Sequence, residues 1–146
     1  MPLPKPIAGL VIRYSYLWLA EHLEGRDEGK KDRPCAIVAA MRVGVDNKDY
    51  VLVLPITHSP PQNLNLAIEI PAITQRRLGL DDDRSWVILT EWNEFVWPGT
   101  DLVPVPGKDE NSFVYGVLPP KFFELIRKRL IELKNANLVD PVRRTE

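Results

Sequence analysis

Cysteine and histidine are scarce in this chain of 146 residues, and their scarcity excludes two common ways of stabilising a small protein. The single cysteine, Cys35, has no partner for an internal disulfide. A structural zinc site needs several cysteine or histidine donors in local pairs, whereas this chain offers only Cys35, His22 and His58, far apart in the sequence. We therefore expect no structural metal and no cofactor.

An excess of either charge is also missing. Lys and Arg number 19, Asp and Glu number 20, and the net charge is −1. A typical duplex-DNA-binding domain is strongly basic, so any nucleic acid would have to meet a local patch of cations.

Long apolar runs are absent too. The longest uncharged stretch, 51–68, is interrupted by Pro55, Pro60, Pro61, Gln62 and Asn63, which would break a membrane-spanning helix. The chain does not open with the charged start, apolar core and cleavage site of a secretory leader. We expect no membrane segment and, given the lone cysteine, a cytoplasmic location.

What is present is enough apolar sequence, 45% of residues, to form the core of one domain spanning 1–146. Short β-rich segments dominate, and strands are expected at 7–18, 34–41, 50–56, 66–70, 86–91, 95–97 and 112–118. A short helical turn is expected after Pro71, ending near Gly79. The polar segment 20–33 is expected to be an exposed loop, and 136–146 a flexible tail.

One amphipathic helix is expected from 119 to 135, because Phe122, Ile126, Leu130 and Leu133 recur at spacings of three and four. Many short strands followed by one terminal helix predict a mainly β (α+β) fold, a small antiparallel barrel with a C-terminal helix that caps the sheet.

Three polar residues are predicted to converge where the hairpin 34–41/50–56 ends. Arg33 precedes the first strand, and Thr57 and His58 follow the second. An arginine fork suits phosphate, a threonine hydroxyl can donate a hydrogen bond, and histidine exchanges a proton near neutral pH. The set suits phosphodiester chemistry, although the same residues could form only an ion pair with Asp32, a strand-end hydrogen bond and an exposed loop.

Other chemistries fit the sequence poorly. The segment 25–31 lacks the spacing and the Ser or Thr of a nucleotide-binding P-loop. The acidic run 81–83 lacks the pattern of a calcium loop and is interpreted as a solvated turn without a metal. Cys35 lies in an apolar strand, where a buried thiol is a poor nucleophile.

The order of these elements resembles the PemK/MazF toxins of bacterial toxin–antitoxin systems. The resemblance rests on 9–12 at the first strand, 28–34 (EGKKDRP) entering the second, 55–57 (PIT) ending the third, and the later segments 66–70, 78–80 and 86–91. It implies an SH3-like barrel that forms a homodimer, cleaves single-stranded RNA without metal, and is neutralised by a cognate antitoxin protein. The family's catalytic Arg and Thr fall on Arg33 and Thr57, and its acidic loop position falls on Glu28. The loop glycine lies further from the arginine than is usual in the family, and 92–111 is longer and richer in proline.

The expected reaction is attack by the RNA's own 2′-hydroxyl on the adjacent phosphorus, which yields a cyclic phosphate and a free 5′-hydroxyl. Arg33 and Thr57 would stabilise the developing charge, and either Glu28 or His58 would remove the proton.

Lys30 and Lys31 are the candidate phosphate-binding cations, and Trp92 is a candidate platform for a base. Two alternatives stay open: a CcdB-like gyrase poison that grips a protein through its cationic terminal helix, and a barrel that binds RNA or a peptide without turnover.

Overall fold

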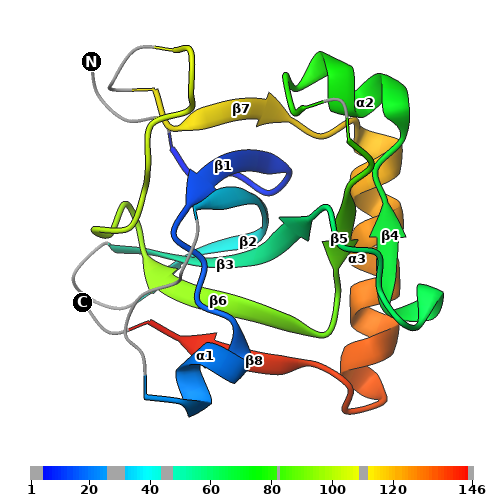
Figure 1. The fold of residues 1–146 in the computed structure, drawn as a ribbon. Coiled ribbons are helices and arrows are strands. Elements are labelled where there is room, and N and C mark those ends of the chain that lie inside the picture. The colour runs from blue at the N-terminus through cyan, green and yellow to red at the C-terminus, as the bar shows by residue number, and fades with distance from the viewer. Residues whose placement is uncertain (1–4, 26–31, 44–47, 82, 109–111, 145–146) are drawn as a thin grey trace.

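The computed structural model describes residues 5–25, 32–43, 48–81, 83–108 and 112–144. Within these ranges the chain forms eight β-strands, three α-helices and one 3₁₀ turn (Figure 1). The elements are β1 (Leu10–Tyr14), α1 (Leu19–Leu23), β2 (Arg33–Val43), β3 (Lys48–Thr57), η1 (Leu64–Leu66), β4 (Ala67–Glu69), α2 (Ala72–Arg77), β5 (Trp86–Ile88), β6 (Glu91–Val96), β7 (Val114–Val117), α3 (Pro120–Asn135) and β8 (Asp140–Arg143).

The centre of the sheet is the antiparallel hairpin of β2 and β3, which confirms the predicted pairing. Its register runs from Cys35 opposite Pro55 to Val43 opposite Lys48. On the far side of β2 the sheet continues through β1 to β7, and on the far side of β3 it continues to β6 and, at the end of the strand, to β5. Among the described residues, hydrogen bonding does not close this sheet into a barrel. The predicted mainly β fold with a C-terminal helix is confirmed.

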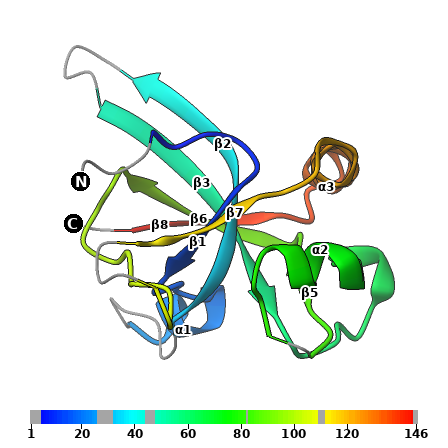
Figure 2. The same cartoon turned by 90° about the horizontal axis from the view of Figure 1, so that it is seen from above.

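Helix α3 covers one face of the sheet, as its apolar stripe predicts. It begins at Pro120, where a missing backbone N–H costs nothing because the first turn has no acceptor for it. Ile126, Leu130 and Leu133 are buried in a core cluster that also contains Val11 and Leu54 from the sheet. Figure 2 shows α3 and the α2–β5 segment on the same side of the long hairpin.

A second core lies on the other face of the central strands. Its members include Ile12, Cys35 and Val53, and the rings of Tyr14 and Phe95 stack at a centroid distance of 4.5 Å. Strand β2 is therefore buried on both faces at 35–37, whereas Met41 at the far end of its apolar run is exposed. Burial raises the pKa of the Cys35 thiol far above its ordinary value, which keeps it protonated and unreactive.

Two segments depart from the expectations. The polar stretch 20–33, expected as an exposed loop, contains most of helix α1, and Glu21 within it is buried. The expected flexible tail at 136–146 is wrong for its central part, because β8 pairs in parallel with β6. Arg144, directly after β8, is buried and donates to the carbonyl of Ser15 at 2.7 Å. A buried polar network thus holds the chain end in place.

None of the helices in the described part of the chain is both long enough and apolar enough to cross a lipid bilayer.

Candidate functional site

A pocket of about 510 Å³ lies at the outer ends of β2 and β3. Arg33, Thr57 and His58 all line it, so the strand pairing brings together the three residues that the sequence places at the strand ends. The segment between α2 and β5 forms one wall, including Asp81 and Ser85. Residues Arg13 of β1 and Tyr115 of β7 also contribute.

Arg33 is the first residue of β2 and is partly buried. Its guanidinium carbon lies 4.9 Å from the ring centroid of Trp18, a cation–π contact that holds the side chain in place. Its Nε is buried and has no hydrogen-bond partner among the described residues. None of the ion pairs between described residues includes Arg33. Arg33 therefore does not form the ion pair with Asp32 that the sequence also allowed. A buried N–H donor without an acceptor favours an anionic ligand.

Thr57 is the last residue of β3. Its Oγ1 accepts the backbone N–H of Ser59 at 3.1 Å, which is the strand-end hydrogen bond considered above. That bond uses the oxygen only as an acceptor, and a hydroxyl can donate its own hydrogen to a second group at the same time. The structural bond and a role toward a ligand are therefore compatible.

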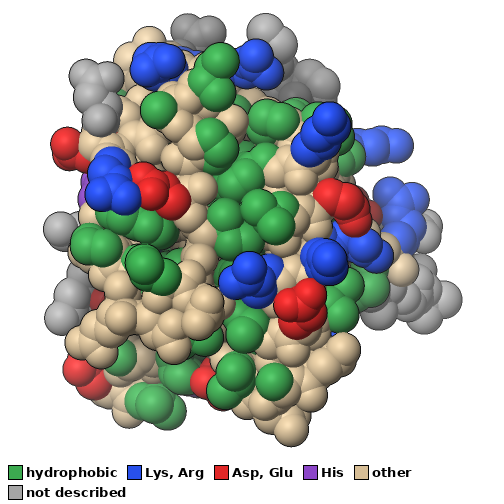
Figure 3. All heavy atoms as spheres, turned by 90° about the vertical axis from the view of Figure 1, so that its right-hand side faces the viewer, with side chains coloured by type: hydrophobic (Ala, Val, Ile, Leu, Met, Phe, Trp, Pro, Cys, Tyr) green, Lys and Arg blue, Asp and Glu red, His purple; other side chains and the backbone are tan. Residues whose placement is uncertain are grey.

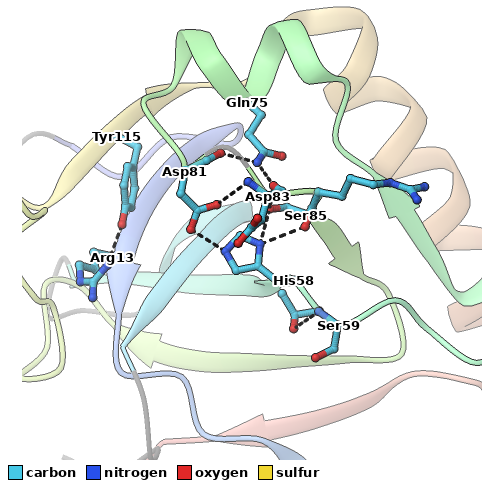
Figure 4. A network of polar contacts seen from close by, with 10 residues as sticks. Arg13, His58, Ser59, Gln75, Asp81, Asp83, Ser85 and Tyr115 are labelled. Atoms are coloured by element: carbon cyan, nitrogen blue, oxygen red, sulfur yellow. Dashed lines mark hydrogen bonds and ion pairs between the residues drawn. The ribbon is translucent and has the colours of Figure 1, made fainter.

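His58 is held through both ring nitrogens (Figure 4). Nδ1 lies 3.0 Å from the carbonyl oxygen of Arg84, and Nε2 lies 2.7 Å from Oδ2 of Asp81. A carbonyl and a carboxylate only accept hydrogen bonds, so these contacts favour the charged imidazolium; Nδ1 also lies 3.1 Å from the Ser85 hydroxyl oxygen. The bond to the Arg84 carbonyl is the main cause of a raised His58 pKa, and Asp81 adds to it against the opposing effect of burial. In the charged form that these contacts favour, the ring can give up a proton and cannot accept one.

The wall around His58 is organised by a network of backbone acceptors. The Gln75 side chain donates from Nε2 to the carbonyl oxygens of Asp81, at 2.5 Å, and Asp83. Gly79 ends α2 with a φ of +70°, a left-handed conformation that glycine adopts without a steric penalty. The chain after this turn places the Asp81 carboxylate beside the His58 ring (Figure 4).

One possible metal-ligand atom from each of His58, Asp81 and Asp83 lies within 4.8 Å of the other two, close enough to hold a cation between them. All three side chains are exposed. The Nε2 atom of His58 already donates to Asp81, and a metal would have to replace that hydrogen. We therefore describe the cluster as a hydrogen-bonded one.

Arg13 and Tyr115 are pocket residues that the sequence analysis missed. Arg13 donates from Nη1 to the Tyr115 hydroxyl oxygen at 2.9 Å. Alternation along the first strand separates Arg13 from the core side of that strand, but only the pairing of β1 with β7 brings Tyr115 beside it. No local sequence signal predicts a pairing across about a hundred positions.

The remaining predicted site residues fall into two groups. Glu28, Lys30 and Lys31 lie outside the described residues, and their roles stay predictions. Trp92 is only 7% exposed, packs in the core cluster beneath α3, and donates from Nε1 to Glu94 at 2.9 Å. Lys134 Nζ lies 5.6 Å from its ring centroid, so the ring is largely covered in this structure and a role in substrate binding stays a prediction.

The His58 contacts predict a pH dependence of stability. Because the folded pKa is raised, the charged ring stabilises the fold fully below its ordinary pKa of about 6.5, and this contribution is lost as pH rises through the folded pKa. The His58 and Asp81 side chains are 48% and 59% exposed, so solvent screening limits the contribution to about 0.5 kcal/mol. Urea unfolding measures this effect. As pH rises above about 6.5, the free energy of unfolding should fall less in His58→Gln than in wild type, whereas His22→Gln should match wild type. Identical pH dependence in wild type and His58→Gln would contradict the assignment.

No protein-family model matches the chain, and comparison with curated proteins and with solved structures gave no match either.

Proposed function

We propose that this protein is a metal-independent endoribonuclease that cleaves single-stranded RNA at specific sequences, in the manner of the PemK/MazF toxins it resembles. The observation that carries the proposal is the meeting of Arg33, Thr57 and His58 in one pocket at the strand ends. Each residue type has a distinct use in phosphodiester chemistry. The strand pairing identifies all three positions, and the resemblance identifies Arg33 and Thr57.

The charge of the pocket supports an anionic ligand. Arg13, Arg33 and His58, whose contacts favour a charged ring, line the pocket together with the two carboxylates of Asp32 and Asp81. Asp81 is already paired with His58. None of the described ion pairs includes either arginine. Two permanent charges without a carboxylate partner in the described part of the chain favour a phosphate-bearing substrate.

The proposed reaction is an intramolecular transfer of the phosphoryl group from the 5′-oxygen to the 2′-oxygen of the RNA. The 2′-oxygen of the RNA forms a bond to phosphorus, the bond from phosphorus to the 5′-oxygen breaks, and a 2′,3′-cyclic phosphate and a 5′-hydroxyl result. Arg33 and Thr57 stabilise the charge on the non-bridging oxygens. In its charged form, His58 supplies a proton to the leaving 5′-oxygen, which replaces Asp81 as the partner of Nε2. The proton of the 2′-hydroxyl passes to Glu28 or to solvent.

Single-stranded RNA suits this chemistry better than a duplex. A splayed strand can place its 2′-hydroxyl in line with the leaving oxygen, whereas a helical duplex holds it away from that geometry. The resemblance further implies two protein partners, a second copy of this chain and a cognate antitoxin, and we include both in the proposal.

A second candidate function rests on the outer face of α3. Leu125 and Ile131 are 47% and 44% exposed and line a shallow hollow of about 480 Å³. Three cations and two carboxylates also line it: Lys121, Arg127, Lys128, Glu124 and Glu132. Figure 3 faces this side of the molecule and shows hydrophobic side chains among charged ones. A gyrase-binding poison of the CcdB type would use such a surface to bind an acidic protein partner.

The assay that tests the proposal incubates the purified protein with mixed single-stranded RNA in excess EDTA. We expect cleavage at a restricted set of sequences, and we expect Thr57→Val to cleave at least about tenfold more slowly because it loses a hydrogen bond to the reacting phosphate. The absence of both RNA binding and cleavage would contradict the nuclease proposal and favour the α3 surface.

A further inference from the structure

We propose that Arg13, positioned by Tyr115, forms a second phosphate subsite that binds the RNA phosphate next to the one being cleaved. The inference rests on the proposed function and extends it, because it assigns a binding role to two residues outside the catalytic set. Figure 4 shows the Arg13–Tyr115 pair on one side of the pocket and the His58 cluster on the other.

The backbone places Arg13 beside the catalytic residues. In the pairing of β1 with β2, Arg13 lies opposite Pro34, the residue after Arg33. Residues directly opposite each other in an antiparallel pair have Cα atoms about 5 Å apart, so the two arginines start from adjoining positions of neighbouring strands. Arg33 pairs with Tyr14, so alternation directs the two arginines to opposite faces, and they meet only at the strand ends, where both line the pocket. A polynucleotide lying in this pocket can therefore contact both.

A break in register turns Tyr115 toward Arg13. Strand β7 pairs Gly116 with Val11 and Val114 with Ile12, so Tyr115 has no partner of its own and is the extra residue of a β-bulge. Bulges redirect a side chain out of the regular alternation and are common next to active sites. The backbone N–H of Arg13 also donates to the Phe113 carbonyl at 2.9 Å, which ties the two strands together at this point.

Among the described residues, the side chain of Arg13 bonds only to Tyr115. The guanidinium has five N–H groups, and the bond to Tyr115 uses one of them. No described carboxylate forms an ion pair with Arg13. The side chain is partly buried, so it is held in one position and screened less by solvent than a fully exposed arginine would be. These are the properties of a residue that binds a phosphate group without taking part in its chemistry.

A subsite of this kind contributes affinity and no sequence preference. Phosphate contacts position a nucleic acid and add to the salt dependence of binding, whereas base contacts determine sequence. Loss of Arg13 should therefore weaken binding of all single strands alike. It should raise KM and leave kcat and the positions of cleavage nearly unchanged.

The test measures binding of a short oligodeoxythymidine, which has the phosphates but lacks the attacking 2′-hydroxyl, by fluorescence anisotropy at several salt concentrations. For Arg13→Gln we expect an affinity about tenfold lower than wild type and a slope of log affinity against log salt that is smaller by about 0.7, the value for one phosphate contact on a single strand. Arg13→Lys should retain the slope, and Tyr115→Phe should retain the slope with weaker affinity. The control is Arg42→Gln, an exposed arginine of the same sheet that pairs with Asp49 and does not line the pocket, and it should match wild type.

A melting curve checks that each variant is folded, and Arg13→Met, which keeps the apolar stem, replaces Arg13→Gln if the latter unfolds. Binding by wild type with an unchanged slope in the variant would overturn the Arg13 subsite and leave the proposed nuclease standing. Absence of binding by wild type, together with absence of RNA cleavage, would overturn both. If Arg13→Gln bound the oligonucleotide as wild type does but had a lower kcat, Arg13 would be a catalytic residue, and the subsite proposal would also be overturned.

Discussion

Replacement of Arg33 by alanine is expected to slow RNA cleavage by about 10² to 10³ fold, and to abolish any inhibition of growth, while the protein stays folded. The size of the loss is that of one preorganised donor aimed at charge that develops in the transition state. The place of Arg33 in the pocket supports this role, and its buried Nε has no acceptor among the described residues.

The matched control is Arg42→Ala, a second arginine on β2 whose side chain is 58% exposed and pairs with Asp49. It should cleave RNA at the wild-type rate. Single-turnover rates and far-UV circular dichroism on both variants separate chemistry from folding. An Arg33→Ala protein that melts far below wild type would assign the contact with Trp18, and not catalysis, as the function of Arg33.

Asn93→Ala is expected to lower the free energy of unfolding by about 3 to 5 kcal/mol. Asn93 is fully buried, and its Oδ1 accepts the backbone N–H of Leu17 at 2.8 Å and Nη1 of Arg144 at 3.2 Å. Its Nδ2 donates to the Leu17 carbonyl at 2.7 Å. The substitution removes the Asn93 partners of the Leu17 N–H and carbonyl, whereas Arg144 keeps its bond to Ser15. Each buried group left unpaired costs about 1 to 3 kcal/mol.

Urea unfolding of Asn93→Ala beside Asn65→Ala measures the effect, since Asn65 is exposed and its loss should change stability by no more than about 0.5 kcal/mol. A loss below about 1 kcal/mol for Asn93→Ala would show that water replaces its hydrogen bonds. The same network attaches the end of the chain, so removal of the residues after Asn137 should destabilise the protein as well.

Local patterns predict the central elements of this fold well. The apolar run 34–41, the turn and the run 50–56 specify a hairpin from neighbouring residues alone. The stripe of Ile126, Leu130 and Leu133 specifies α3 and the side on which it packs. Both features depend on contacts close in sequence or on one periodicity, and a single sequence contains that information.

Other elements depend on distant contacts. Strand β8 contains two charged residues and a proline, and its place beside β6 depends on bonds such as that from Arg144 to Asn93, 51 positions away. Alternation could not show that Trp92 lies under α3, because either face of β6 is compatible with an aromatic residue. In the site, strand order predicted the meeting of Arg33, Thr57 and His58, whereas the bulge that directs Tyr115 toward Arg13 has no signature in the sequence.

The most direct test of the proposed mechanism is the chemical identity of the RNA ends formed in the presence of EDTA. The mechanism predicts a 2′,3′-cyclic phosphate on the upstream fragment and a 5′-hydroxyl on the downstream one. It also predicts that a single 2′-deoxy substitution at the cleaved position abolishes cleavage there without weakening binding. Cleavage that leaves a 5′-phosphate, or that continues at the 2′-deoxy position, would contradict it.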